Sequence, residues 1–108
     1  MKEIRAYVQP HKLSQITMAL LEIPGFPGMS IMDCEGFGRE RTEHSQDYKP
    51  FLVKKRLEIF SPDNLVEIIF ETILRTAHSG HHGDGKVYIL DVLEGGRVSS
   101  GERDKDLG

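Results

Sequence analysis

Apolar residues recur with two different periods in this chain, and the two periods alternate along it. Ile4, Ala6 and Val8 occupy every second position, which is typical of a strand with one buried face. The spacing then becomes three and four over Leu13, Ile16, Leu20 and Ile23, which is typical of a helix with one apolar face. In chain order the patterns predict a strand over 2–9, a helix over 12–23, strands over 29–35 and 53–60, a helix over 62–77 and a strand over 86–93.

This order is that of the split βαβ, or ferredoxin-like, α+β fold. In that fold two helices cover one face of a four-stranded antiparallel sheet and leave the other face open. A chain of 108 residues supports one such domain, spanning 1–108. Because Tyr7 and Phe60 are expected on the open face, the sequence also predicts self-association.

The second helix has the clearest expected boundaries. Ser61 followed by Pro62 is typical of an N-cap and a first helical position, and Gly80 is expected just after the helix end. The residues expected to face the core are Leu65, Val66, Ile69, Phe70, Ile73, Leu74 and Ala77. Cys34, the single cysteine, is expected to be buried in the 29–35 strand, and a lone cysteine fits a reducing cytoplasm.

Composition limits the possible partners. With 14 basic and 17 acidic residues, the net charge of −3 gives no general attraction to nucleic acid or anionic lipid. The run Lys54-Lys55-Arg56 is split between two strand faces, so we expect a solvated edge with Lys54 turned toward a phosphate. Since no stretch approaches the roughly 18–20 apolar residues of a spanning helix, we expect a soluble, cytoplasmic protein.

A glycine-rich stretch, Gly80-His81-His82-Gly83-Asp84-Gly85-Lys86, separates the second helix from the last strand. Glycine lets the main chain approach a ligand closely, and a neighbouring lysine adds charge, so the stretch predicts a phosphate-binding turn. It is not a P-loop, because its lysine leads into a strand instead of a helix. A simple tight turn after a glycine helix cap is the alternative.

With these elements in order, the chain resembles the PII signal-transduction family. The resemblance lies in Met1-Lys2-Glu3-Ile4, Lys12-Leu13, Gly36-Phe37-Gly38-Arg39, Lys54 to Ile59, Gly83-Asp84-Gly85-Lys86 and Gly101-Glu102-Arg103. It implies a homotrimer with adenine nucleotide (ADP, ATP or AMP, with or without Mg) bound in the clefts between subunits. It also implies that the segment of about 39–53 is the T-loop, which docks on a partner protein.

The resemblance assigns roles to individual residues. Nucleotide binding is expected from Ser30, Gly36, Gly38, Arg39, Glu40, Lys54, Gly83, Asp84, Gly85, Lys86 and Arg97. Ser30 stands where the family has an adenine-contacting threonine, and Arg97 is expected to reach phosphate from the neighbouring subunit. Partner contacts are expected from Arg41, Glu43, His44, Asp47 and Tyr48 of the loop. The tail of about 94–108 is expected to be flexible.

Three departures from the family pattern indicate a divergent member. Ser99 replaces a second tail arginine, Glu40 replaces a glutamine that helps hold Mg-ATP and 2-oxoglutarate, and the tyrosine motif that is uridylylated in nitrogen regulators is missing around Tyr48. A carboxylate at position 40 would repel phosphate and dicarboxylate groups. We therefore expect a PII-like regulator whose partner is a membrane transporter, for heavy-metal efflux or for bicarbonate.

Two other functional classes remain to be weighed. His78, His81 and His82 lie close in the sequence and are weak candidates for a metal site, so a trimeric metal-binding protein of the CutA-like kind is the alternative. The acids Glu40, Asp84 and Asp91 have no nucleophile or base at a motif spacing, so we do not expect an enzyme.

Overall fold

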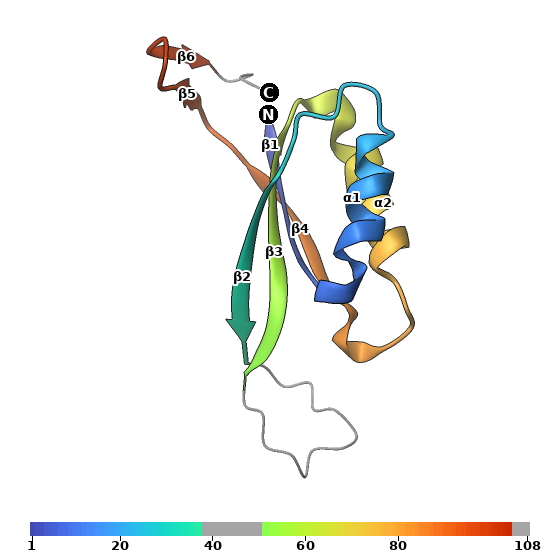
Figure 1. Cartoon of the computed structure of the whole chain (residues 1–108). Helices are drawn as coiled ribbons and strands as arrows, with labels where there is room; N and C mark the ends of the chain where they lie inside the picture. The colour runs from blue at the N-terminus through green and yellow to red at the C-terminus, as the bar shows by residue number, and fades with distance from the viewer. Residues whose placement is uncertain (38–50, 105–108) are drawn as a thin grey trace.

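The computed structural model describes residues 1–37 and 51–104 (Figure 1). The elements are β1 (Lys2–Val8), η1 (Pro10–Lys12), α1 (Leu13–Leu21), β2 (Ser30–Gly36), β3 (Leu52–Ser61), η2 (Asp63–Leu65), α2 (Val66–Ala77), η3 (His82–Asp84), β4 (Gly85–Asp91), β5 (Gly95–Arg97) and β6 (Glu102–Asp104). In the described part of the chain, no helix is long and apolar enough to cross a membrane.

The four long strands form one antiparallel sheet in the order β2-β3-β1-β4. Ile4 of the central strand lies opposite Ile59 of β3 and Ile89 of β4, so apolar residues line one face of the sheet across three strands. Both helices lie on that face (Figure 1). The predicted ferredoxin-like α+β fold is therefore confirmed.

The core lies between the helices and this face of the sheet. Its buried apolar residues are Ile4, Ala6, Val8, Ile16, Leu20, Ile23, Leu57, Ile59, Val66, Ile69, Ile73 and Ala77. The strand positions alternate and the helix positions recur every three or four residues, as the sequence predicted. β2 lies at the sheet edge, where Ile31 stays 45% exposed although its register partner Leu57 is fully buried.

Three local predictions differ from the structure. Ser61 is fully buried at the end of β3, and its hydroxyl donates to the Pro62 carbonyl at 2.9 Å; a 3₁₀ turn then precedes α2, so Ser61 caps no helix. Leu74 is 51% exposed, because the buried stripe of α2 runs through its neighbour Ile73. Cys34 is half-buried, since edge strand β2 leaves it short of the core.

The open face of the sheet carries a charged centre. Arg5 donates two hydrogen bonds to Glu3, at 2.8 and 2.9 Å, and Arg56 donates one to Glu58 at 2.6 Å. The Arg56 guanidinium also lies 5.9 Å from the centre of the Tyr7 ring, a cation–π distance. Phe60 and Tyr88, on the same face, are 46% and 47% exposed.

After β4 the chain forms a small hairpin, β5–β6. Its turn contains Gly101 at φ +73°, and the Gly101 amide donates to the Arg97 carbonyl at 2.8 Å. Arg97 approaches its cross-strand neighbour Glu102 at 3.6 Å, and Arg103 donates to Glu94 at 2.5 Å. Part of the tail that the sequence predicted to be flexible therefore has a regular backbone.

Candidate functional site

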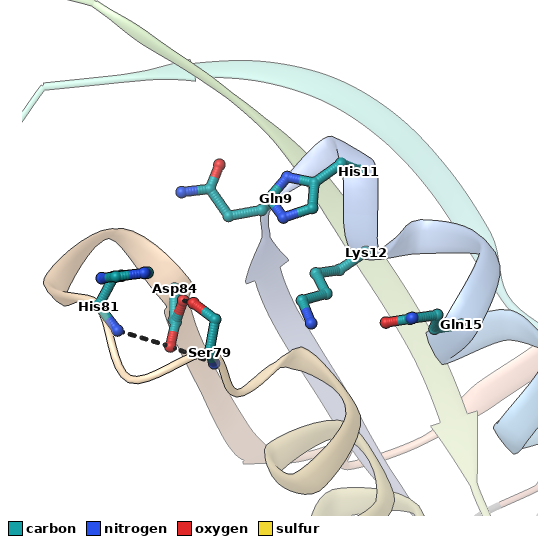
Figure 2. Close-up of a pocket in the computed structure, with 7 residues that line it drawn as sticks. All are labelled: Gln9, His11, Lys12, Gln15, Ser79, His81 and Asp84. Atoms are coloured by element: carbon teal, nitrogen blue, oxygen red, sulfur yellow. Dashed lines mark hydrogen bonds between the residues drawn. The ribbon is translucent and has the colours of Figure 1, made fainter.

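The glycine-rich turn is organised by the carboxylate of Asp84. This carboxylate accepts hydrogen bonds from the amides of Ser79 (2.7 Å) and His81 (3.3 Å) and from the Ser79 hydroxyl (Figure 2). It also accepts one from the Gly80 amide at 2.9 Å. The Ser79 hydroxyl, followed by the backbone amides, stabilises the charged form and holds the pKa of Asp84 well below its usual range. The Asp84 amide in turn donates to the His81 carbonyl at 3.1 Å. The Asp84 oxygens are therefore engaged within the turn.

Gly85 brings the turn against the end of β1. Its φ of +113° is rare for any residue with a side chain, and a Cβ built on it would lie 1.8 Å from the Tyr7 carbonyl oxygen. Since Tyr7 O belongs to the central strand, no side-chain rotation could relieve that contact. Only glycine fits this position.

The Gly83 carbonyl accepts hydrogen bonds from two side chains that lie far from the turn in the sequence. Gln9, just after β1, donates to it at 2.5 Å, and the Lys54 ammonium from β3 donates to the same oxygen. The turn is thus held at Gly83 by side-chain donors, at Asp84 by its own backbone and at Gly85 by close packing. A turn held in this way has its shape before any ligand arrives.

Lys86 directly follows this fixed turn. It is exposed at the start of β4, and its register partner is Tyr7 of the open sheet face. Its ammonium can therefore meet an anion that approaches the turn from outside. The arrangement provides a fixed glycine-rich backbone with one exposed cation.

The structure brings together some of the predicted site residues and separates others. Lys54 and Gly83 are joined by the hydrogen bond described above, and Lys86 follows Gly83 by three residues. Gly36 ends β2, and Ser30 begins that strand opposite Glu58. Arg97 lies beyond the opposite end of β4 from the turn (Figure 1). Gly38, Arg39, Glu40, Arg41, Glu43, His44, Asp47 and Tyr48 lie outside the described residues.

The three histidines proposed for a metal do not form a site. Among residues 1–37 and 51–104, no group of three or more His, Cys, Asp or Glu side chains could hold a metal ion. His81 instead takes part in the turn through its backbone, whose carbonyl accepts the Asp84 amide hydrogen at 3.1 Å. The described residues therefore give no support to the metal-binding prediction.

Two residues that build the turn were missed by the sequence interpretation. Gln9 and Ser79 each bond to the turn, but neither belongs to a motif. Ser79 lies five residues before Asp84, where a local side-chain bond was a possible signal. Gln9 lies 74 residues from Gly83, and nothing in the local sequence indicates that contact.

Comparison with known proteins agrees with the fold. Residues 1–102 match the family described as "Nitrogen regulatory protein P-II". The chain is 39% identical over 110 residues to nitrogen regulatory protein P-II 1 of Escherichia coli (strain K12), with 96% of each chain covered. It is 38% identical to nitrogen regulatory protein P-II of Klebsiella oxytoca, with 96% of each chain covered, and 38% identical to that of Haemophilus influenzae, with 98% covered. The predicted resemblance is confirmed in preference to a CutA-like protein: the chain belongs to the P-II family of nitrogen regulatory proteins.

Proposed function

We propose that this chain acts as a homotrimer that binds an adenine nucleotide, ADP, ATP or AMP, between its subunits and signals through residues of about 39–53 to a partner protein. Membership of the P-II family makes the chain a regulatory signalling protein and not an enzyme. The observation that carries the nucleotide proposal is the fixed turn ending in exposed Lys86.

The turn suits a phosphate group. Glycines at 83 and 85 leave the main chain uncovered, and Lys86 offers a charge-assisted hydrogen bond. The negative charge of Asp84 would oppose an anion, but its oxygens already accept four hydrogen bonds within the turn. Asp84 then acts by shaping the turn, while Lys86 contacts phosphate. A magnesium ion accompanying ATP would be held mainly by the phosphates.

The position of Arg97 supports a site between subunits. From Lys86 to Asp91 the strand β4 spans about 16 Å at ~3.3 Å per residue, and Arg97 lies further on in the hairpin. One bound nucleotide therefore does not contact both Lys86 and Arg97 of the same chain. If Arg97 binds the same phosphates as Lys86, it comes from a second copy, and the open sheet face with Phe60 and Tyr88 is the surface available for that copy.

The output surface is proposed at the far end of the β2–β3 pair. Phe37 and Phe51 flank the segment that joins these strands, with ring centres 6.3 Å apart and rings inclined at 53°. Their side chains are 78% and 58% exposed, which is unusual for phenylalanine outside an interaction surface. An aromatic pair beside a polar loop favours a protein as the partner. We propose a membrane transporter, with heavy-metal efflux and bicarbonate transport as the candidate classes.

Calorimetric titration tests the nucleotide site. ADP, ATP and AMP are titrated with and without Mg into the parent, into Lys86→Ala and into Lys2→Ala as a control of equal charge. Lys2 pairs with Asp91 at the other end of the sheet. Losing one charge-assisted phosphate contact weakens binding about tenfold or more, so Lys86→Ala should bind ADP at least that much more weakly while Lys2→Ala is unchanged. Equal ADP binding by all three proteins would refute the assignment of the turn.

Hydrogen exchange tests the signalling step. If nucleotide alters the affinity of residues 39–53 for a partner, linkage requires the partner to alter nucleotide affinity by the same factor. Backbone exchange over 39–53 should therefore differ between the free and ADP-bound proteins. Identical exchange at demonstrated saturation would remove the loop from the mechanism.

A further inference from the structure

A separate cavity lies on the helix side of the same turn. It has a volume of about 290 Å³ and is lined by Gln9, His11, Lys12, Gln15, Ser79, His81 and Asp84. In Figure 2, the residues from the end of β1 and the start of α1 form one wall, and the residues from the segment between α2 and β4 form the other. The first wall holds Lys12, and the second holds the turn.

The hydrogen-bonding groups on the two walls are not equally occupied. On the turn side, Ser79 and Asp84 are bonded to each other, and the Asp84 carboxylate also accepts the His81 amide hydrogen. On the α1 side, the side chains of His11, Lys12 and Gln15 make no hydrogen bond or ion pair with any other described residue. The cavity therefore has satisfied acceptors on one wall and unused donors on the other.

The chemistry of the unused groups is that of an anion site. The Lys12 ammonium has only donors, and the Gln15 amide and the His11 ring each offer an N–H. The His81 ring, on the other wall, also offers an N–H. Asp84 adds no free acceptor for a cation, and within the described chain no three metal-binding side chains converge.

We infer that this cavity binds a small carboxylate or oxyanion, with Lys12 as the charged contact and with Gln15, His11 and His81 as hydrogen-bond donors. Its volume lies at the lower limit of the ~300–1,000 Å³ typical of ligand pockets, which favours a compact ligand over a nucleotide. The site differs from the proposed phosphate contact at Lys86, which does not line the cavity. The His81 amide donates to Asp84, so a ligand that moved His81 would also move the turn. Binding of the anion and binding of the nucleotide would therefore be coupled.

Backbone amide NMR of the full chain tests this inference with two probes in chloride buffer, succinate for carboxylates and inorganic sulfate for oxyanions. Each probe is titrated into the parent, Lys12→Gln, Lys86→Ala and Lys2→Gln. Lys12 is only partly buried and contributes no contact to the core, so Lys12→Gln should fold normally, and its unchanged amide shifts in β1 and β3 verify this. Lys2→Gln makes the same change in net charge at the other end of β1.

The expected result is saturable shift changes at residues 11–15 and 79–84 with at least one probe. The apparent affinity should fall about tenfold in Lys12→Gln and persist in Lys2→Gln and Lys86→Ala. The probe that saturates at the lower concentration identifies the ligand class. The inference is overturned if neither probe saturates, or if Lys12→Gln binds as the parent does. Loss in Lys86→Ala alone would place the anion on the phosphate turn, which refutes the cavity site and leaves the proposed nucleotide function standing.

Discussion

Replacing Gly85 by alanine should destabilise the protein more than any other single added methyl group in the turn. A Cβ at this position would lie 1.8 Å from the Tyr7 carbonyl oxygen and 2.9 Å from the Tyr7 carbonyl carbon. The added methyl group and the central strand must therefore separate by roughly 1.5–2 Å to reach van der Waals contact. Because both are attached to main chain, this movement disturbs the pairing of Gly85 with Val8.

Two costs add at this position. A residue with a side chain at φ +113° and ψ −164° is strained by about 1–3 kcal/mol. Forcing a methyl group into a packed contact costs about 1–3 kcal/mol more. We therefore expect Gly85→Ala to lose about 2–6 kcal/mol of the free energy of unfolding, a large part of the ~5–15 kcal/mol typical of a domain.

Gly80→Ala is the matched control. Gly80 also has a positive φ, +87°, but a Cβ built there has no atom within 4 Å. It should show only the backbone strain of about 1–2 kcal/mol. Urea unfolding of both variants, at one fixed subunit concentration because association contributes to stability, measures the difference. If Gly85→Ala is no less stable than Gly80→Ala, the close contact with Tyr7 does not hold the turn, and our account of it is wrong.

Three further predictions concern other parts of the chain. The pKa of Asp84 is held low in the folded protein, so the charged carboxylate adds stability above the unfolded pKa of ~3.9, and this stability is lost as pH falls below that value. The urea midpoint of the parent should therefore drop more steeply between pH 5 and pH 2 than the midpoint of Asp84→Asn. Parallel curves for the two proteins would contradict this. Light scattering after gel filtration should give three times the 12.2 kDa chain mass, and a monomer at micromolar concentration would exclude the trimer. Because Glu40 is negatively charged, 2-oxoglutarate should bind weakly in the presence of Mg-ATP, and Glu40→Gln should increase its affinity in a calorimetric titration. Tight 2-oxoglutarate binding by the parent would show that the charge at residue 40 does not set this affinity.

The fold could be predicted because its elements are encoded by local periods. The alternation around Ile4 and the helical spacing around Ile16 each identify one element, and the order of the elements then favours one topology. The predicted helix cap at Ser61 was wrong because tertiary packing outweighed the local capping preference of serine. Ser61 is a good cap in isolation, but in the sheet it is a fully buried strand end whose hydroxyl bonds to Pro62.

The candidate site was predictable only in part, for the same reason. Glycines followed by Lys86 indicate a turn that accepts an anion, and that is a local signal. The need for glycine at position 85 comes from Tyr7, and the bond that holds Gly83 comes from Gln9. These partners are more than 70 residues away along the chain, so no local pattern records them.

The central place of β1 in the sheet has a kinetic consequence. β1 comes first in the chain, yet its neighbours are β3 and β4, so Lys2 pairs with Ser61 on one side and with Asp91 on the other. Such distant pairings make loop closure costly and slow folding relative to helical domains of similar size. A nascent chain that ends before Gly85 leaves one edge of β1 unpaired, and an unpaired apolar strand can pair with another chain. The last strand of the main sheet to be synthesised therefore protects the first from aggregation.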